Sequence, residues 1–293
     1  MKFVILKTLR NLKIMVLLDN IAALRQWRKS VGKLALIPTM GNLHEGHLNL
    51  IKAAKNKAPD ILLSIFVNPI QFGPREDFNN YPRTLDQDLK KAQAAGTSAV
   101  FAPSIKEMFP YGKQHIYVHS SQLENYYCGE TRPGHFQGVL TIVARLFNIA
   151  APDWAYFGKK DAQQLAIIEK MVKDFNHPIE IVGVDIVRED DGLARSSRNV
   201  YLTDEERKEA VHLSKSLKLA KDMYAEGERR SHILVGAIKT YLQEHTSGHI
   251  DEVAIYSYPE LEVVNEINGQ IFIALAVKFS KARLIDNIIL GSK

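Results

Sequence analysis

Short apolar runs alternate with longer amphipathic segments along the first two thirds of the chain. The apolar runs predict strands over Leu34–Ile37, Ile61–Val67, Ala99–Ala102, Trp154–Phe157 and Ile179–Val184. The amphipathic segments between them predict helices over Leu48–Lys57, Thr84–Ala95, Gly138–Ile149 and Asp161–Phe175. This alternation is typical of βαβ units, so we expect an α/β domain built on a parallel sheet.

The pattern changes after Arg198. Thr203 and Glu206 form a capping-box signature, and a stripe of apolar residues at helical spacing follows it as far as Gly227. A second helix is predicted over His232–Glu244. Three strands are predicted after it, over Val253–Tyr256, Leu261–Val264 and Ile271–Val277, with Asn268-Gly269 as a tight turn between the last two. We therefore expect a first domain over residues 1–187 and a smaller α+β lid domain over 188–293, joined by a polar hinge near 186–192.

Composition narrows the class of protein. The chain has 293 residues, of which 46% are hydrophobic, enough for one or two packed domains. Its net charge of +5 comes from scattered Lys and Arg residues, so an anionic small molecule is expected as ligand and nucleic acid is not. A single cysteine, Cys128, precludes an intrachain disulfide and favours a cytoplasmic location. No apolar run approaches the roughly 20 residues needed to span a bilayer, so no membrane association is expected.

The main group of candidate functional residues lies where the first predicted strand ends and a helix begins. His44 and His47 stand three residues apart, with Gly41 before them and Gly46 next to His47, just before the predicted helix. In a parallel sheet this turn lies at the carboxyl edge, where ligands bind, and a helix start offers N–H groups to phosphate. Two other readings stay open, a surface pair without function and half of a metal site. The flanking strand, helix and glycines favour the phosphate site.

His44-x-Gly46-His47 resembles the HIGH signature of the adenylate-forming nucleotidyltransferase superfamily. The longer string Pro38–His47 resembles one branch of it, the pantoate–β-alanine ligase family. The resemblance extends in the family's order from residue 15 to about residue 203. The further strings that carry it are Ser64–Gly73, Asp77-Phe78, Tyr81–Thr84, Arg132–Phe136, Phe157–Gln164 and Ser196–Asn199.

The resemblance implies a fold, a reaction and a set of partners. The first domain would be Rossmann-like and would bind nucleotide and pantoate. The reaction would join pantoate to β-alanine through a pantoyl-adenylate, with release of AMP and pyrophosphate, as a step toward coenzyme A. ATP would be the co-substrate, with Mg²⁺, and a homodimer is expected. Family members begin near Met15, so residues 1–14 are expected to be a dispensable extension.

The resemblance also assigns roles to individual residues. It implies His44, His47 and Lys160 as catalytic groups that stabilise charge on phosphate. It places the ATP site at Met40, Gly41, Asn42, Leu43, His44, Glu45, Gly46, His47, Gly158, Lys159, Lys160, Asp161, Val187, Arg195, Ser196, Ser197 and Arg198. It implies Gln71, Gln164 and Asn68 as substrate-binding amides, and Asp88 as a candidate metal ligand.

Several of these residues leave alternatives open. Met40 could serve as packing alone, and Asp161 could cap a helix or hold a ribose. Arg195 stands where the family usually has Met or Leu, so it either adds a cation near the phosphates or points outward. The side chain of Lys159 is expected to face solvent, and Gln163 is expected at the surface. Two other functions also stay open: a nucleotidyltransferase acting on a phosphorylated acceptor, and a basic RNA-binding protein.

Overall fold

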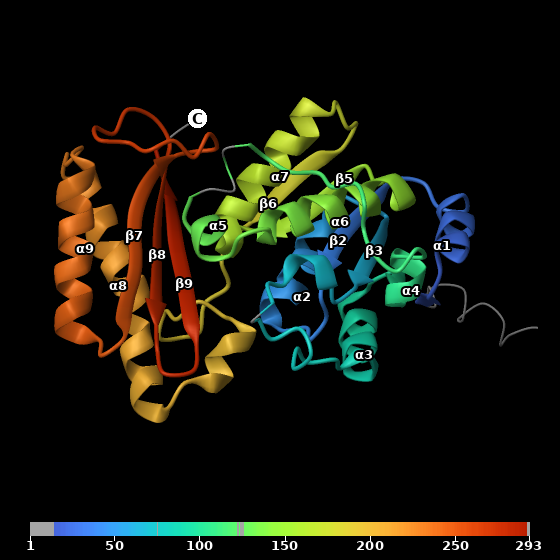
Figure 1. Cartoon of the computed structure of the whole chain (residues 1–293), viewed down its shortest axis with the longest axis horizontal. Helices are drawn as coiled ribbons and strands as arrows, with labels where there is room; N and C mark the ends of the chain where they lie inside the picture. The colour runs from blue at the N-terminus through green and yellow to red at the C-terminus, as the bar shows by residue number, and fades with distance from the viewer. Residues whose placement is uncertain (1–14, 75, 122, 124–125, 292–293) are drawn as a thin grey trace, which may run out of the picture.

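The architecture is α/β with a second, smaller sheet, as Figure 1 shows for the computed structural model of the chain. The structure describes residues 15–74, 76–121, 123 and 126–291. The first sheet has six parallel strands in the order β1-β4-β3-β2-β5-β6. These strands are β1 (Val16–Leu18), β2 (Leu34–Thr39), β3 (Asp60–Ile65), β4 (Ala99–Phe101), β5 (Trp154–Gly158) and β6 (Glu180–Val184). The predicted parallel sheet is confirmed, and β1 is a short edge strand that the apolar pattern did not reveal.

Helices cover both faces of this sheet. The helices of this first domain are α1 (Ile21–Arg28), α2 (Glu45–Lys55), α3 (Leu85–Ala95), α4 (Ile105–Met108), α5 (Cys128–Thr131), α6 (His135–Ala150) and α7 (Ala162–Asp174). Three 3₁₀ turns, η1 (Pro69–Gln71), η2 (Lys159–Asp161) and η3 (Ser197–Tyr201), stand in loops. The four predicted helices are present as α2, α3, α6 and α7, and α6 begins three residues before its predicted start.

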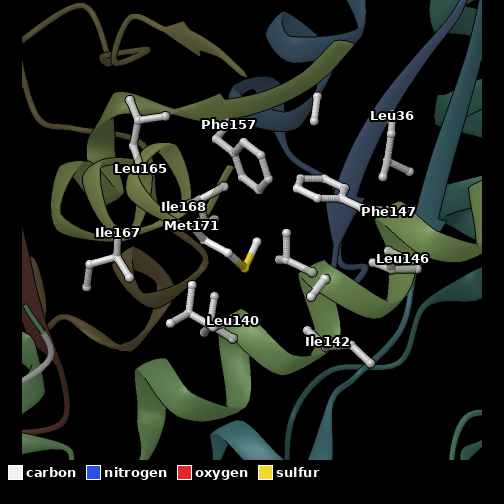
Figure 2. Close-up of a cluster of buried hydrophobic side chains, with 14 of the residues drawn as sticks. Leu36, Leu140, Ile142, Leu146, Phe147, Phe157, Leu165, Ile167, Ile168 and Met171 are labelled. Carbon is white, nitrogen blue, oxygen red and sulfur yellow. The ribbon is translucent and has the colours of Figure 1, made fainter. Parts of the chain in front are cut away.

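Successive side chains of β2 point to opposite faces of the sheet, which explains how two cores form. Leu34 and Leu36 pack with α6 and α7, whereas Ala35 and Ile37 pack with α2 and α3 on the other face. Figure 2 shows the first of these layers, where the ring of Phe147 of α6 lies between Phe157 of β5 and Leu36 of β2. Because both faces are buried, the strand reads as a continuous apolar run rather than as an alternation.

The second sheet is antiparallel, in the order β7 (His249–Ser257), β8 (Ile271–Lys278) and β9 (Arg283–Leu290). It lies between the first domain and the helix pair α8 (Asp204–Ala225) and α9 (Ser231–His245) (Figure 1). The predicted capping box is confirmed, since Thr203 Oγ1 accepts from the Glu206 N–H and Glu206 Oε2 accepts from the Thr203 N–H.

Strand β8 is buried on both sides. Ile271, Ile273, Leu275 and Val277 pack against α8 and α9, whereas Phe272, Ala274 and Ala276 belong to the core of the first domain. The smaller domain therefore has its own core and also contributes an apolar face to the other core. The division at residues 187 and 188, and the movement of the smaller part as a lid, stay predictions.

Two expectations for the smaller domain were wrong. Leu261–Val264 is not a strand of the sheet: it makes one isolated bridge, between Val263 and Tyr256, and Val263 is 68% exposed. Leu261 is buried with a φ of 59°, a backbone conformation that no regular strand adopts. The Asn268-Gly269 turn therefore leads into β8 without joining two sheet strands. The third strand of the sheet is β9, which the apolar pattern did not predict.

No helix within the described part of the chain is long and apolar enough to cross a membrane. The expectation that residues 1–14 form a dispensable extension concerns residues outside those that the structure describes.

Candidate active site

A cavity of about 280 Å³ opens between the carboxyl ends of β2 and β5. The strand order reverses at this pair, because β3 and β4 lie on one side and β6 lies on the other. Such a switch point leaves a crevice above the sheet, which is where ligands of open α/β folds bind. Fifteen predicted site residues line the cavity: Met40, His44, Gly46, His47, Asn68, Gln71, Gly158, Lys160, Asp161, Gln164, Val187, Arg195, Ser196, Ser197 and Arg198.

The two histidines cap the N-terminal turn of α2. His44 is the N-cap residue, and its Nδ1 accepts a hydrogen bond from the Gly46 N–H at 3.1 Å. Nδ1 of His47 accepts from the His44 N–H at 3.3 Å, which completes a capping box built from two imidazoles. Since both Nδ1 atoms are acceptors, the proton of each neutral ring lies on Nε2. Both rings line the cavity and can offer these Nε2–H groups to an anion.

The surroundings of both histidines favour the neutral form of the ring. Burial lowers the pKa of His47 to about 3, and the neighbouring His44 and Lys91 contribute to this lowering. Burial also lowers the pKa of His44, together with the positive charges of Lys160, Lys91 and Arg195. Each neutral ring can therefore offer one N–H group to a ligand in the cavity.

Asp88 shapes the loop before α2 and does not line the cavity. Its Oδ2 accepts from the Asn42 N–H at 2.9 Å, and its Oδ1 accepts from the Leu43 N–H at 2.7 Å. Lys91, on the same helix, donates to the Leu43 carbonyl at 2.6 Å. These bonds hold the chain where Gly41 and Asn42 both adopt positive φ. Gly41, Asn42, Leu43 and Glu45 do not line the cavity, so this loop contributes by placing its neighbours.

A neutral hydrogen-bond network forms one end of the cavity, which we call the acceptor end and define by Met40, Asn68, Gln71 and the adjoining α6. Asn68 Nδ2 donates to Gln71 Oε1 at 2.9 Å and to the Gly138 carbonyl at 3.1 Å. Gln71 Nε2 donates to the sulfur of Met40 at 3.1 Å. Asn68 Oδ1 is buried and finds no partner among the described residues, so it can accept from a ligand.

Helix α6 reaches this network because Gly138 has no side chain. A Cβ at Gly138 would lie 2.3 Å from the Ile70 carbonyl and 2.6 Å from Gln71 Cα. One residue further on, Val139 contributes to an apolar wall of the cavity together with Ile142 and Val143. The acceptor end therefore combines amide groups with methyl-bearing side chains.

A second series of hydrogen bonds ends at the backbone carbonyl of Gln71. Glu76 pairs with Arg132 through two bonds of 2.7 Å, and Arg132 Nη1 lies 2.9 Å from His135 Nε2. Since arginine can only donate, His135 Nδ1 carries the proton and donates to the Gln71 carbonyl at 2.9 Å. Burial and the charge of Arg132 lower the pKa of His135 to about 4, and the Arg132 hydrogen bonds lower the pKa of Glu76.

Cations gather at the other end of the cavity, which we call the phosphate end and define by Lys160 and the segment Arg195–Arg198. Arg195 lines the cavity and pairs with Glu189 at 3.1 Å, and its role as a cation near the phosphates stays a prediction. Ser196 Oγ accepts from the Arg198 N–H and caps η3. Lys159 does not line the cavity; its side chain is partly exposed and pairs with Asp185 at 2.6 Å.

Sequence reasoning misplaced one residue and gave no role to several others. Gln163 is buried, not at the surface, because it donates to the Leu123 and Tyr126 carbonyls before α5 and accepts from the N–H of Cys128, the first residue of α5. The cavity-lining residues without an assigned role include Tyr81, Arg132, His135 and Asp185. The first three lie inside strings that carried the family resemblance, so the signal was present without a role attached.

A cavity at the switch point of a parallel sheet, with cationic side chains at one end and neutral amides at the other, is typical of α/β proteins that bind nucleotides. A profile of the Pantoate-beta-alanine ligase family matches residues 16–289. The chain is 61% identical over 282 residues to a pantothenate synthetase of Staphylococcus haemolyticus, across 96% of this chain and 99% of that protein. The chain therefore belongs to the pantoate–β-alanine ligase family.

Solved structures agree with this assignment. The crystal structure of pantothenate synthetase from Thermus thermophilus superposes with a TM-score of 0.88 at 41% identity, over 94% of this chain and 99% of that chain. A pantoate-β-alanine ligase from Francisella tularensis, solved in complex with β-γ ATP and β-alanine, has a TM-score of 0.76 at 32% identity. That match covers 94% of this chain and 98% of the other.

Proposed function

We propose that this chain joins pantoate to β-alanine at the expense of ATP, through a pantoyl-adenylate. The observation that supports this most strongly is the division of one cavity into a neutral acceptor end and a cationic phosphate end. An acid and a nucleotide bound at the two ends would bring a carboxylate to the α-phosphate, and family membership supplies their identities.

At the acceptor end, Gln71, Gln164 and Asn68 would bind pantoate. This acid carries two hydroxyls, a carboxylate and two methyl groups on one carbon. The amides provide both donors and acceptors for its oxygens, and the apolar wall around Val139 accommodates its methyl groups. The carboxylate would then lie near Met40 and His47, between the two ends.

At the phosphate end, the residues would stabilise charge as the first bond forms. The pantoate carboxylate oxygen attacks the α-phosphorus of ATP, the bond to the β-phosphate breaks, and pyrophosphate leaves. Lys160 would stabilise the charge that develops on the α-phosphate, while Ser196, Ser197 and Arg198 would hold the departing pyrophosphate. The Nε2–H groups of His44 and His47 would donate to phosphate oxygens.

The second step needs no further nucleophile from the protein. The neutral amine of β-alanine attacks the acyl carbon of the adenylate, the acyl–oxygen bond breaks, and AMP leaves with the bonding electrons. The amine loses one proton as the amide forms. The contribution of the protein to this step is to position the amine and to exclude water from the adenylate.

Magnesium would accompany ATP, without a protein cage of its own. Among the described residues, no group of three or more His, Cys, Asp or Glu side chains is arranged to hold a metal ion. Mg²⁺ keeps several waters and binds readily to phosphates, so this arrangement suits a metal brought by the nucleotide. The assignment of Asp88 as a ligand stays a prediction, and its bonds to Asn42 and Leu43 favour a role in holding the loop. The homodimer and the cytoplasmic location also stay predictions.

The test is AMP release from ATP and Mg²⁺ with pantoate and β-alanine together, and with each omitted in turn. We expect AMP and pantothenate in equal amounts only when both substrates are present. Transfer of AMP to a phosphorylated acceptor, with no dependence on β-alanine, would instead support a nucleotidyltransferase of the wider superfamily. No AMP under any of these conditions would refute the proposal.

A further inference from the structure

Strand β9 of the smaller domain reaches the catalytic turn of the first domain. Asn287 is buried, and its Nδ2 donates to the Lys160 carbonyl at 2.7 Å and to the Lys159 carbonyl at 3.1 Å. One side-chain amide thus binds two successive carbonyls of η2, the turn that presents Lys160 to the cavity. Both protons of the amide group are used in this way.

The preceding residue of β9 binds Arg188, which lies shortly before the Arg195–Arg198 segment. Asp286 is buried and pairs with Arg188 through two bonds, at 2.7 and 3.0 Å. Its Oδ1 also accepts from the Asn287 N–H at 2.8 Å, so the carboxylate and the amide are fixed relative to each other. A paired carboxylate of this kind holds its partner in one geometry, because a guanidinium and a carboxylate match two bonds at a time.

Arg188 transmits this contact to the phosphate end. It opens a short hairpin in which it bridges to Ala194, and it donates to the Gly192 carbonyl at 3.1 Å. The return leg of the hairpin leads directly into Arg195, whose N–H donates to the Val187 carbonyl. Asp286 is therefore linked, through Arg188 and this hairpin, to the start of the Arg195–Arg198 segment.

We propose that Asp286 and Asn287 are positioning residues that hold the two cationic segments of the phosphate end at a fixed separation. Asn287 acts on Lys160 through the η2 backbone, and Asp286 acts on Arg195–Arg198 through Arg188. The inference rests on the proposed function, because it assigns these segments to ATP. Under this proposal the smaller domain helps to position the cations, in addition to any role as a lid.

The main test removes the Asn287 bonds and measures the first half-reaction. The assay is pyrophosphate release from ATP and pantoate without β-alanine, in a single turnover with full-length enzyme in excess. Asn287→Ala should slow this step by about 10- to 100-fold at saturating ATP, since small displacements of catalytic groups have effects of this size. Asn287→Asp should slow it further, because a carboxylate would face two carbonyl oxygens.

Tyr127→Phe is the matched control. Tyr127 also makes a buried hydrogen bond between the two parts of the chain, from its hydroxyl to the Leu275 carbonyl at 2.8 Å, but among the described residues it makes no hydrogen bond to η2 and it does not line the cavity. The control should lower the thermal midpoint about as much as Asn287→Ala does, while leaving the half-reaction near the wild-type rate. An equal loss of rate in both variants would mean that Asn287 matters only for stability, and would overturn the inference.

A double variant tests whether Asn287 acts through Lys160. If it does, adding Asn287→Ala to Lys160→Ala should cause little further loss, because the group being positioned is already absent. Multiplication of the two losses would contradict this route. A wild-type enzyme that releases no pyrophosphate would instead count against the proposed function itself, so the two failures can be told apart.

Asp286→Asn tests the second part of the proposal, in which Asp286 acts on Arg195–Arg198 through Arg188. It leaves Arg188 with an amide partner in place of a carboxylate, and it should raise the KM for ATP several-fold more than it changes the KM for pantoate. Equal changes in both KM values would overturn the proposed link from Asp286 to the Arg195–Arg198 segment. Arg188→Lys should shift the ATP KM in the same direction, since lysine cannot make the two-bond contact.

Discussion

The two ends of the cavity are built by opposite means. The acceptor end is neutral, lies within the first domain, and is fixed by bonds among Asn68, Gln71 and Met40. The phosphate end is cationic, and two of its anchoring contacts come from β9 of the smaller domain. The difference teaches that recognition of the acid and placement of the cations are separate problems, with separate structural supports.

The largest expected effect comes from removing a cation at the phosphate end. Lys160→Ala should reduce the rate of AMP formation by about 10² or more, by analogy with the loss of one charge-stabilising donor. The KM for pantoate should change little, because the acceptor end is untouched. Steady-state AMP release, with ATP and pantoate each varied, measures both quantities.

Lys170→Ala is the control, since Lys170 is an exposed lysine on the helix that follows η2 and pairs only with Asp174 among the contacts of the described chain. It should retain wild-type rates. If Lys160→Ala raised the KM for pantoate by as large a factor as it lowered the rate, the two ends of the cavity would not act independently.

The next largest effect comes from disturbing the acceptor end. In Gly138→Ala, the new Cβ would clash with the Ile70 carbonyl and with Gln71 Cα, so η1 or α6 must move. We expect the KM for pantoate to rise by at least about tenfold. Overpacking of this kind should also lower the free energy of unfolding by about 1–3 kcal/mol, measured by denaturant titration.

A second helical glycine provides the control. Gly236 lies in α9, and a Cβ there would meet nothing within 4 Å. Gly236→Ala should leave the KM for pantoate unchanged and raise the free energy of unfolding by about 0.5–1 kcal/mol. If Gly138→Ala were equally harmless, the close approach of α6 to Gln71 would not define the acceptor end.

A smaller effect concerns the pH dependence of folding stability, which arises in part from His135 behind the acceptor end. The pKa of His135 is about 4 in the folded chain, against an ordinary value of 6.5, so the unfolded chain binds this proton more readily. Stability is therefore fully present above pH 6.5 and is lost as the pH falls toward 4, by up to about 1.4 kcal/mol per pH unit for one group.

His135→Asn should flatten this slope, and denaturant unfolding at several pH values between about 4.5 and 7.5 would measure it. The remaining slope is expected from His44 and His47, whose pKa values are also lowered. An unchanged slope in His135→Asn would show that burial of this ring is not what couples stability to pH.

The smallest expected effect concerns Arg195. Its side chain is about one-third exposed and already paired with Glu189, so its charge is screened. Arg195→Met should raise the KM for ATP by about two- to fivefold, with no change for pantoate. It should also raise the pKa of His44, which NMR titration would detect, because Arg195 is one of the charges that lower it.

Local patterns predicted most of the first domain and little of what ties the domains together. The buried strands of the parallel sheet are continuous apolar runs, and the capping box at Thr203 is a local signal, so both could be read directly. Strand β9 was missed because it carries Asp286 and Asn287, residue types that are depleted in strands. Their burial makes sense only beside Arg188 and η2, which are distant in the sequence.

The site shows the same limit. Fifteen of the residues that the motifs singled out line one cavity, whereas Gly41, Asn42, Leu43, Glu45, Asp88 and Lys159 do not. The motifs did not reveal that His44 and His47 cap each other, or that Gln163 and Gln164 point to different surroundings although they are neighbours. Those features follow from the turn of the helix and from three-dimensional contacts, which a pattern of residue types does not encode.

The most direct test of the account is the exchange of labelled pyrophosphate into ATP by the wild-type enzyme. If pantoate and ATP react at the two ends of one cavity to form an adenylate, exchange should require pantoate and Mg²⁺ and should proceed without β-alanine. Exchange that appears only after β-alanine is added, or that proceeds without pantoate, would contradict the account.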